Sequence, residues 1–524
     1  MPDCLHTPFF ETARRHPERQ AVVDAKERAT YGQLAHRARL AAAHLQAAGV
    51  GRGDRVALLL DRSAVTIAAM LGAMSLGAVC VPFDMRWPVV RRRRLLDVLD
   101  VRAAVLVQPD APEAAAVPLR FTPAWLASPI ACRPPGTPCP GTPEAADAAD
   151  NLACILFTSG TAGPPKGVCL THRAARAFVD WIGRETGLGP QDRIASVSPF
   201  TAELSLFDIH ATLAAGATLV LVDNQHLAVP SGLGALLADE AITGLYTVPT
   251  VLSLLAARGG LDRHQPAALR LVMSSGEPFA GSAFSQLQQA LPASVQHYHF
   301  YSSVETNVCT MHKLSGTDPV PARLPIGRPR PGIDVVPMPL EAGSAYGPGA
   351  VELCVAGDTL MSGYWGDVRD LAPHWWDHPR TGRRHFRTGD VARQDAEGVW
   401  HYLGRADRPL TINGRWVDAT EVERMLMREP GVAHCAVAAA ERGTGGQLVA
   451  HVVPRPGHDL ARLKLRLAAS CIETLPEHMQ PQAYVIRGQL PLKPSGRLDR
   501  GALGLGLRDE PEQPLPADDD QAPR

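Results

Sequence analysis

Short apolar segments alternate with helical patterns through the first part of the chain, and this alternation predicts the fold class. The helical patterns begin at Ala64 and just after Pro88. The apolar segments, each short enough to be one core strand, span residues 55–60, 78–82, 103–107, 217–222, 244–249 and 269–276. Strands that alternate with helices are typical of parallel βαβ units. We therefore predict an α/β protein whose large, multi-layer N-terminal domain contains doubly wound sheets.

Residues 63–83 contain no charged side chain over a length that could cross a bilayer. The segment is rich in Ala, Gly and Ser rather than Leu and Ile, and it ends in the β-type run "AVCVP". These features favour a buried helix that leads into a core strand over a membrane span.

Changes in composition predict the domain boundaries. Residues 111–149 are rich in Pro and Ala, which indicates a surface linker or a mobile strap. A helix followed by a strand over residues 421–440 indicates a small α+β domain, and the acidic, proline-bearing end of the chain indicates disorder. We expect an N-terminal domain over residues 1–406, a small C-terminal domain over residues 407–505 and a disordered acidic tail over residues 506–524.

The overall composition is that of a soluble protein with at least two hydrophobic cores. The chain has 524 residues, 45% of them hydrophobic, and a formal net charge of −1. This balance argues against a nucleic-acid-binding or membrane-surface protein. The N-terminus lacks the basic and apolar regions of a signal peptide, so we expect a cytoplasmic location.

Three local features have ordinary structural explanations. The ten cysteines include no CxxC pair, so we interpret them mostly as small buried residues rather than as a disulfide framework or a zinc site. The arginine run 91–94 opens a helix, and we expect a solvated helix face there rather than a nucleic-acid contact. The "RGD" at residues 52–54 lies among glycines that form a turn into a strand.

The stretch "LFTSGTAGPPKGV", residues 156–168, has the chemistry of a phosphate-binding loop. It is not a Walker A motif, because Pro165 precedes Lys166 and Gly167 follows it. Gly160 and Gly163 nevertheless expose backbone amides, several hydroxyls can donate hydrogen bonds, and Lys166 adds a positive charge. Taken alone, the stretch is also compatible with a flexible surface turn.

Seven further motifs accompany this loop in order along the chain. They are "ATYGQL" at 29–34, "SLGAVCVPFD" at 75–84, "FYSSVETNVC" at 300–309, "SGYWG" at 362–366, "FRTGD" at 386–390, "GRADR" at 404–408 and "LPLKPSGRLDR" at 490–500. Together they resemble the motifs of the adenylate-forming (ANL) superfamily, and most closely the adenylation domains of nonribosomal peptide synthetases and their stand-alone relatives. The resemblance implies a two-step reaction: a carboxylate attacks the α-phosphate of ATP and releases pyrophosphate, and a thiol then captures the acyl-adenylate. Such chemistry depends mainly on positioning and on stabilising negative charge.

The resemblance also assigns roles in nucleotide binding. It implies that Glu305 binds Mg²⁺, that Asp390 binds both ribose hydroxyls, and that Arg405 assists at the ribose or phosphate. The residues implied to hold the β- and γ-phosphates are Thr158, Ser159, Gly160, Thr161 and Lys166, with Thr161 also a catalytic candidate. The residues implied to enclose adenine are Gly276, Glu277, Pro278, Tyr301 and Ser302. Asp407 matches the hinge between the two domains.

The chain departs from the family pattern at Arg497, where the family usually has lysine at the reacting carboxylate and α-phosphate. Arginine keeps the charge and can contact two oxygens, but its planar head is bulkier than an ammonium. Lysine occurs only at positions 26, 166, 313, 464 and 493, so replacement of Lys by Arg is a general trend in this sequence. We expect Arg497 to take the catalytic role; the alternatives are that Lys493 reaches in, or that adenylation is weak.

A second departure concerns the substrate. In amino-acid-activating relatives an aspartate pairs with the substrate amino group, and Glu203 occupies that place in the run 202–207. Its longer arm moves the charge deeper, toward a smaller or differently placed amine. The other pocket positions implied by the motifs are Leu204, Phe207, Tyr246, Met273, Ser275, Phe300, Val308 and Cys309. Because several of these side chains are bulky, we predict a small amino acid such as glycine, alanine, serine or a short β-amino acid, with proline as the competitor.

These features predict a stand-alone ligase that uses ATP and Mg²⁺ to activate a small amino acid. No "LGGxS" carrier segment follows the small domain, so we expect the thiol in trans, as the phosphopantetheine of a separate carrier protein or as coenzyme A. An acyl- or aryl-CoA ligase is the alternative, although a buried Glu203 without an amine partner would be costly in an apolar acid pocket. A degenerate nucleotide-binding protein with weak turnover, suggested by Arg497, is a further alternative.

Overall fold

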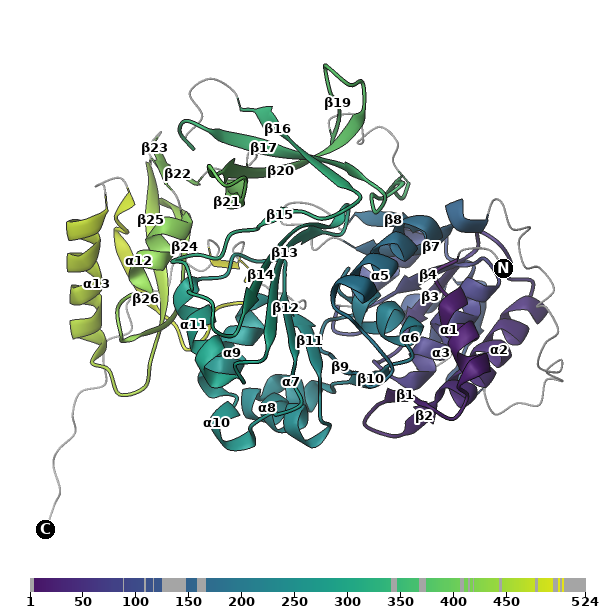
Figure 1. Ribbon diagram of the computed structural model, residues 1–524. Coiled ribbons are helices and arrows are strands. Elements are labelled where there is room, and N and C mark those ends of the chain that lie inside the picture. Colours follow the sequence, from purple (N-terminus) through teal and green to yellow (C-terminus); the bar gives the residue numbers. More distant parts are fainter. Residues whose placement is uncertain are drawn as a thin grey trace, which may run out of the picture. The chain divides into compact units, whose positions relative to one another are not determined.

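The protein consists of two compact units, which are described separately. The computed structural model describes residues 4–87, 89–107, 110–115, 117–124, 148–157, 166–340, 346–366, 374–405, 410–412, 415–417, 419–442, 445–475, 479–492, 498–499 and 502–503. The first unit runs through Leu403 and the second begins at Gly404 (Figure 1). The boundary expected at residues 406 and 407 and the tail 506–524 lie outside the described residues.

A seven-stranded sheet forms one layer of the first unit. Its strand order is β18-β8-β7-β4-β3-β5-β6, with parallel pairing from β7 through β6. The strands are β3 (Arg55–Leu59), β4 (Val79–Pro82), β5 (Ala103–Leu106), β6 (Leu119–Phe121), β7 (Leu152–Phe157), β8 (Gly167–Thr171) and β18 (Gly363–Tyr364). The three predicted strands in this region are confirmed as β3, β4 and β5.

A nine-stranded sheet forms the second large layer. Its order is β15-β14-β13-β12-β11-β9-β10-β1-β2, and the strands from β13 to β1 are parallel. The strands are β1 (Gln20–Val23), β2 (Arg28–Thr30), β9 (Arg193–Ser196), β10 (Thr218–Leu221), β11 (Gly244–Thr247), β12 (Leu271–Ser274), β13 (Gln296–Ser303), β14 (Asn307–Ser315) and β15 (Arg328–Pro329). Here β10, β11 and β12 confirm the three remaining predicted strands.

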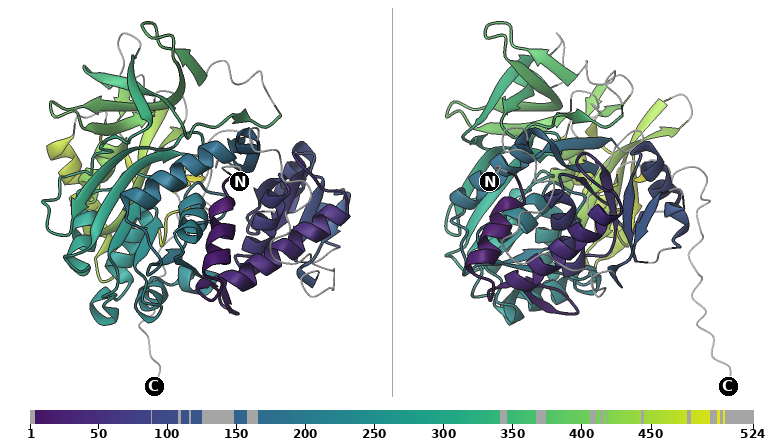
Figure 2. Two further views of the ribbon diagram at one scale, coloured as in Figure 1. Left: turned by 45° about the vertical axis from the view of Figure 1, so that its right-hand side comes forward. Right: turned by 90° about the vertical axis from the view of Figure 1, so that its right-hand side faces the viewer.

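Helices cover both faces of both sheets, which gives the predicted multi-layer arrangement (Figures 1 and 2). The layer packed between the sheets contains α1 (Thr7–Arg15), α2 (Tyr31–Ala47), α3 (Ala64–Ser75), α5 (His172–Glu185), the π-helical segment η4 (Leu206–Ala211) and α6 (Thr212–Ala214). The outer face of the seven-stranded sheet packs against α4 (Val89–Val98). The outer face of the nine-stranded sheet packs against α8 (Pro230–Asp239), α9 (Pro249–Arg258), α10 (Leu261–His264) and α11 (Gly281–Ala290), with α7 (Asn224–Ala228) preceding α8.

The apolar segment 63–83 forms helix α3 and strand β4, as predicted. Ten of the twelve residues of α3 are buried, on all sides of the helix. At Gly72 a Cβ atom would lie 2.6 Å from the carbonyl oxygen of Ala38 and 2.8 Å from the Cβ of Ala41, both on α2. Small residues thus allow two helices to approach closely between the sheets. Among the helices that the structure describes, none is long and apolar enough to cross a membrane.

A third sheet completes the first unit and carries Asp390. Its strands are β16 (Ile333–Pro339), β17 (Ala350–Gly357), β19 (Trp375–Asp377), β20 (Arg384–Gln394) and β21 (Trp400–Arg405). The pairings β16–β17, β17–β20 and β19–β20 are all antiparallel. The "FRTGD" motif lies in the middle of β20.

The second unit has the α+β composition predicted for the small domain. It contains a hairpin of β22 (Leu410–Ile412) and β23 (Arg415–Val417) and a sheet of β24 (Val432–Arg442), β25 (Gly445–Pro454) and β26 (Ala483–Ile486). Two helices, α12 (Ala419–Leu426) and α13 (Leu460–Thr474), share a hydrophobic core with the sheet.

Two local expectations are wrong. The interpretation of residues 111–149 as a linker is wrong at β6, which pairs in parallel with β5. This short edge strand has no fully buried side chain, so its sequence shows no run of apolar residues that would predict a strand. The solvated face expected at residues 91–94 fails at Arg92, which is buried. Its guanidinium donates to Glu113 at 2.6 and 3.0 Å and to the carbonyl of Trp87 at 2.6 Å, because a distant acidic residue provides the partner that burial requires.

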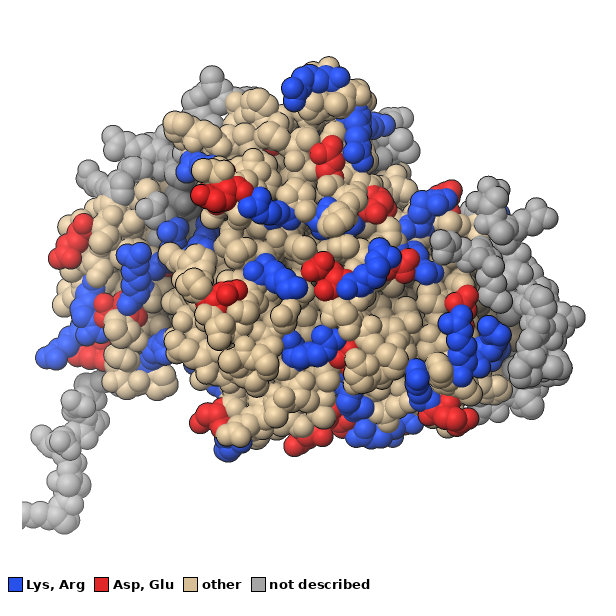
Figure 3. Space-filling view, in the orientation of Figure 1, with Lys and Arg blue, Asp and Glu red and all other residues tan. Residues whose placement is uncertain are grey.

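The cysteines behave as predicted wherever the structure describes them. Seven of those eight cysteines are buried and Cys435 is partly buried, and none of the eight forms a disulfide. On the face shown in Figure 3, basic and acidic side chains of the described residues are interspersed, in keeping with the formal net charge of −1.

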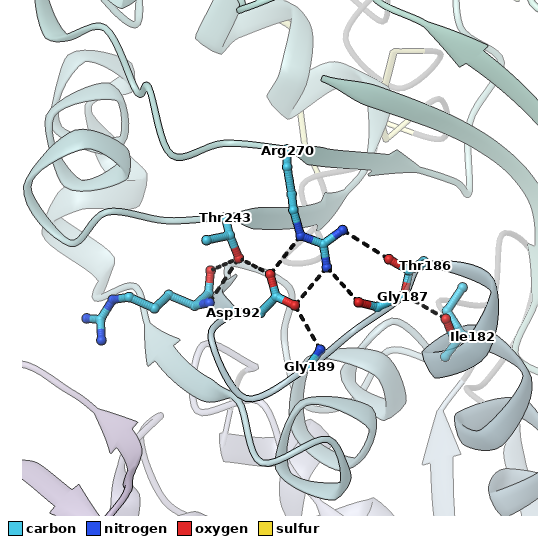
Figure 4. A network of polar contacts seen from close by, with 8 residues as sticks. Ile182, Thr186, Gly187, Gly189, Asp192, Thr243 and Arg270 are labelled. Carbon is cyan, nitrogen blue, oxygen red and sulfur yellow. Dashed lines mark hydrogen bonds and ion pairs between the residues drawn. The ribbon is translucent and has the colours of Figure 1, made fainter. Parts of the chain in front are cut away.

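A polar network ties together the amino ends of three strands of the nine-stranded sheet (Figure 4). The Asp192 carboxylate, which is fully buried, accepts hydrogen bonds from Arg270 Nε and Nη2 at 2.8 and 2.7 Å, from Thr243 Oγ1 at 2.7 Å and from the Gly189 amide at 2.9 Å. Arg270 also donates to the carbonyl of Thr186, just after α5, at 3.0 Å. Burial raises the pKa of Asp192, but the hydrogen bonds outweigh it and the net pKa lies below the usual range.

Three histidines pack together where α1 meets α5 and η4. The rings of His6 and His172 are T-shaped with centroids 5.5 Å apart, and His172 Nδ1 accepts a hydrogen bond from the Leu5 amide at 3.2 Å. Burial lowers the pKa of His6 to about 3, that of His172 to about 4 and that of the neighbouring His210 to about 3. All three rings are therefore neutral in the folded protein at neutral pH.

We expect Arg270→Met to lower the free energy of unfolding by about 3 kcal/mol, because it leaves the buried Asp192 charge without its cation. Urea denaturation measures the change. The matched control is Arg15→Met, which breaks an exposed 3.7 Å ion pair with Glu11 and should cost less than about 0.5 kcal/mol. Equal losses for the two variants would contradict the assigned importance of the network.

The histidine cluster predicts acid sensitivity. The folded pKa values lie below the unfolded value of about 6.5, so the stability that these rings contribute is complete above that pH and is lost as the pH falls below it. We expect the free energy of unfolding to decrease between pH 7 and pH 5, and His172→Gln to make this decrease shallower. The exposed His458→Gln should leave the pH profile unchanged; denaturant titrations at each pH provide the test.

Candidate active site

The ends of the glycine-rich loop are fixed by the β7–β8 pair. Phe157 lies opposite Gly167 in this antiparallel ladder, so the loop begins and ends at neighbouring positions. A Cβ at Gly167 would lie 3.0 Å from Ile155 Cγ2 and 3.3 Å from Trp365 Cβ, so the exit of the loop is closely packed. Lys166, directly before β8, places its Nζ 4.8 Å from the ring centroid of Tyr364. The loop residues Thr158, Ser159, Gly160 and Thr161 lie outside the described residues.

Glu305 occupies the turn between β13 and β14 and faces the same tyrosine. Tyr364 Oη donates to Glu305 Oε1 at 2.9 Å, and the Met361 amide donates to the Glu305 carbonyl at 2.8 Å. Among the described residues no cluster of three or more His, Cys, Asp or Glu side chains could hold a metal ion. A single carboxylate next to a phosphate-binding loop instead fits Mg²⁺, which is commonly held by one or two carboxylates together with substrate phosphates.

Asp390 and the segment expected at adenine are directly connected. Asp390 Oδ2 accepts a hydrogen bond from Tyr301 Oη at 2.6 Å, and its Oδ1 lies 3.5 Å from Tyr402 Oη. Burial raises the pKa of Tyr301 well above its usual value, and the Asp390 charge adds to this shift. Tyr301 is therefore a neutral donor that holds the carboxylate implied to bind ribose.

The Gly276–Pro278 segment follows β12 and is fixed by its glutamate. Gly276 has a φ of 86°, a left-handed conformation that suits glycine. The Glu277 carboxylate accepts hydrogen bonds from the amide and hydroxyl of Thr250, at the start of α9, at 3.1 and 2.6 Å. The side chain of Glu277 thus anchors the segment that the motif resemblance predicts to contact adenine.

Glu203 is buried near Tyr246, one of the aromatic side chains predicted to line the substrate pocket. It is 2% exposed, and its Oε1 accepts a hydrogen bond from Ser302 Oγ at 3.1 Å. Tyr246 forms T-shaped contacts with Phe207 and with Phe300, at centroid distances of 5.8 and 5.7 Å. The structure buries all the predicted pocket residues: Leu204, Phe207, Tyr246, Met273, Ser275, Phe300, Val308 and Cys309. Ser302, which was expected at adenine, therefore also contacts Glu203, the carboxylate predicted to bind the substrate amino group.

The polar groups of the pocket are organised by neutral donors. Tyr246 Oη donates to Ser275 Oγ at 2.8 Å. Burial raises the pKa of Tyr246, and the nearby carboxyl groups of Glu203 and Asp208 shift it in the same direction. The tyrosine hydroxyl thus stays protonated beside two acidic side chains.

The sequence interpretation missed Asp208 and Arg62 close to this pocket. Asp208 is fully buried in η4, and burial raises its pKa to about 8. Burial likewise lowers the pKa of Arg62 to about 10. Asp208 has the largest effect in the opposite direction and raises this pKa. Arg62 donates to the backbone carbonyls of Ser196 and Val197, which links the β3–α3 connection to the end of β9. The available signal was an aspartate inside the apolar run "LFDIHATLAA".

Behind the pocket wall lies a fully buried arginine. Arg330 donates to the Val308 carbonyl at 2.9 Å and to Thr359 Oγ1 at 3.0 Å, and its guanidinium lies 4.9 Å from the Trp181 ring centroid. Trp181 in turn contacts the Phe300 ring at 6.0 Å. This arrangement fixes two residues that face the pocket, Phe300 and Val308.

The described structure does not test four further predicted residues. Lys493, Arg497 and Asp407 lie outside the described residues. Arg405 ends β21 and belongs to the second unit. Their roles remain predictions.

A multi-layer α/β unit and a small α+β unit that carry Glu203, Glu305 and Asp390 at the predicted motif positions are the features expected of adenylate-forming ligases. Two family models match the chain: AMP-binding enzyme over residues 9–365 and AMP-binding enzyme C-terminal domain over residues 421–497. The chain belongs to the AMP-binding enzyme family. The predicted fold class and the prediction of an ATP-dependent adenylating ligase are thereby confirmed.

Two relatives that match this chain over nearly their whole length support this assignment. The chain is 32% identical over 504 residues to an L-proline--[L-prolyl-carrier protein] ligase of Pseudomonas fluorescens, covering 95% of this chain and 98% of the relative. It is 31% identical over 528 residues to the ligase of the same name from Streptomyces coelicolor, with 96% and 97% coverage.

Solved structures share the fold. ATP-bound MatB from Rhodopseudomonas palustris has a TM-score of 0.81 at 22% identity and covers 96% of this chain and 98% of that chain. The amide bond synthetase McbA from Marinactinospora thermotolerans has a TM-score of 0.80 at 26% identity, with 95% and 99% coverage.

We expect Asp390→Ala to weaken AMP binding about 10- to 100-fold, because it removes charge-assisted hydrogen bonds to the ribose. Isothermal titration with AMP measures the effect. Asp377→Ala, an exposed change on the neighbouring strand β19, is the control and should bind AMP normally. Unchanged affinity in the Asp390 variant would contradict the ribose assignment.

Proposed function

We propose that this protein activates a small amino acid as aminoacyl-AMP and transfers it to the phosphopantetheine thiol of a separate carrier protein. The observation that carries the proposal is the buried Glu203 carboxylate, which lies near the buried aromatic ring of Tyr246. A carboxylate in this position is complementary to the ammonium group of an amino acid, and ring faces also attract cations. The two relatives from Pseudomonas fluorescens and Streptomyces coelicolor are named as ligases that join proline to a carrier protein, which supports both the substrate class and the acceptor.

The bulk of the side chains at the predicted substrate positions supports a small substrate. Tyr246 contacts both Phe207 and Phe300 edge to face, and Met273 and Ser275 are fully buried. Glycine, alanine, serine and short β-amino acids fit this description. Proline is equally compatible, because its secondary ammonium retains two N–H donors and its ring is compact, and the relatives place it first for testing.

The first step joins the amino acid carboxylate to the α-phosphorus of ATP. A phosphorus–oxygen bond forms, the bond to the β-phosphate breaks, and pyrophosphate leaves with the electron pair. Lys166 would contact the β- and γ-phosphates, and Glu305 would hold Mg²⁺, which neutralises the developing negative charge when bound. Asp390, held by Tyr301, would orient the ribose and thereby the α-phosphate.

The second step transfers the aminoacyl group. The thiol sulfur attacks the carbonyl carbon, a thioester forms, AMP leaves, and the thiol proton passes to solvent.

Within the first step, Arg497 would stabilise negative charge on the reacting oxygens, with Lys493 as the alternative. Glu203 would hold the ammonium group through both steps.

A pyrophosphate-exchange panel tests the amino acid class. We expect exchange with proline or another small amino acid, and little with large aromatic or fatty acids. Glu203→Gln should lower kcat/KM for the preferred amino acid about 10²- to 10³-fold with little change in the KM for ATP, since one buried charge pair is lost. The desamino analogue of that substrate should react equally poorly with both proteins, which isolates the Glu203–ammonium pair.

The control for this experiment is Glu27→Gln, which removes a partly exposed ion pair with Arg37. It should leave exchange unchanged. Competition between a phosphopantetheinylated carrier protein and free coenzyme A identifies the acceptor. Exchange that responds only to acids without an amino group would refute the proposal, as would equal losses in the two glutamate variants.

A further inference from the structure

Residues 361–365, which include most of the "SGYWG" motif, are attached to the exit of the glycine-rich loop. Strand β18 pairs with β8, with Tyr364 opposite Val168. The Trp365 amide donates to the Gly167 carbonyl at 2.7 Å, next to Lys166, and the Ser362 amide donates to the Cys169 carbonyl at 2.9 Å. These backbone hydrogen bonds fix the backbone position of Tyr364.

The same segment holds Glu305 by both backbone and side chain. The Met361 amide donates to the Glu305 carbonyl, and Tyr364 Oη donates to Glu305 Oε1, at 2.8 and 2.9 Å. The loop exit and the turn between β13 and β14, which are about 140 residues apart in sequence, are therefore connected through one short strand.

One tyrosine contacts two groups of opposite charge. Its hydroxyl binds the Glu305 carboxylate, and its ring lies 4.8 Å from Lys166 Nζ. No ion pair joins Lys166 to Glu305, both of which the structure describes. If the two charges paired directly, triphosphate binding would first have to break that pair. A hydrogen bond from a neutral hydroxyl and a cation–π contact orient the two charges without neutralising either, so both remain available.

The ring also continues toward the ribose side of the site. The ring centroids of Tyr364 and His374 lie 6.2 Å apart, and His374 stacks on Phe386 at 5.9 Å. Phe386 begins the "FRTGD" motif that contains Asp390. The tyrosine ring therefore has a packing role that is separable from the role of its hydroxyl.

We propose that Tyr364 is a positioning residue for the triphosphate end of ATP. It holds the carboxylate of Glu305 for the magnesium-bound phosphates and keeps the ammonium of Lys166 beside its ring, so that the two charges do not pair. This inference rests on the proposed function, because it requires the site to bind ATP with Mg²⁺. It does not depend on which amino acid is activated.

Tyr364→Phe tests the hydroxyl while keeping the ring. We expect Kd for Mg·ATP, measured by titration calorimetry, to rise about 3- to 10-fold, and the Mg²⁺ concentration that half-saturates exchange to rise by a similar factor. Kd for AMP should stay within about twofold of wild type and the melting temperature should be unchanged, since AMP lacks the β- and γ-phosphates. A purely structural role would instead alter both ligands and the melting temperature.

Tyr298→Phe is the matched control. Tyr298 also has a lysine over its ring, with Lys313 Nζ at 5.1 Å, and its hydroxyl contacts the Glu185 carbonyl at 3.2 Å. This variant should leave Mg·ATP binding, AMP binding and the Mg²⁺ dependence unchanged. The inference is overturned if Tyr364→Phe matches wild type for Mg·ATP and Mg²⁺, or if it weakens AMP and Mg·ATP equally. Failure of the amino acid panel would refute the proposed function while this nucleotide comparison still decides the role of Tyr364.

Discussion

The first unit depends on one shared layer of small-residue helices between two large sheets. Close approach of α2 and α3 at Gly72 keeps this layer thin enough for residues of both sheets to contribute to one continuous hydrophobic core. Parallel strands place their carboxyl ends on a common edge, and ligands of open α/β sheets bind at such edges. The segments after β7, β9, β12 and β13 supply the glycine-rich loop, Glu203, the Gly276 segment and Glu305. The chemistry of the site is thus a consequence of how the core is layered.

The three acidic side chains of the site share a mode of support. Ser302 donates to Glu203, Tyr301 to Asp390 and Tyr364 to Glu305, so each carboxylate accepts a hydrogen bond from a neutral hydroxyl. A neutral donor orients a carboxylate without cancelling its charge. Such support suits the contacts proposed for these groups, with an ammonium, a ribose and a magnesium ion. By contrast, Asp192 and Glu113 bind arginines at sites of structural importance.

Much of the fold followed from the sequence because buried parallel strands appear as continuous apolar runs. The strands β3, β4, β5, β10, β11 and β12 all lay in such runs. The residues predicted to line the substrate pocket could be identified because they lie in or near short recognisable motifs, and the structure buries all of them. What the sequence did not reveal were partners distant along the chain. Nothing near Arg92 points to Glu113, and nothing near Asp208 points to Arg62. Strand β6 was missed because an edge strand buries too little side-chain area to need an apolar pattern.

The pairing of β18 with β8 has a consequence for the order in which the protein forms. Ser362 and Cys169 are 193 positions apart, so this contact closes a very long loop. Contacts of such separation form late, because the entropy of loop closure must be overcome before they contribute stability. During synthesis, β7 and β8 are complete long before the ribosome delivers the segment that holds Lys166 and Glu305 in place. A chain that is interrupted before residue 361 would have its two largest sheets almost complete and yet lack an organised site for the triphosphate.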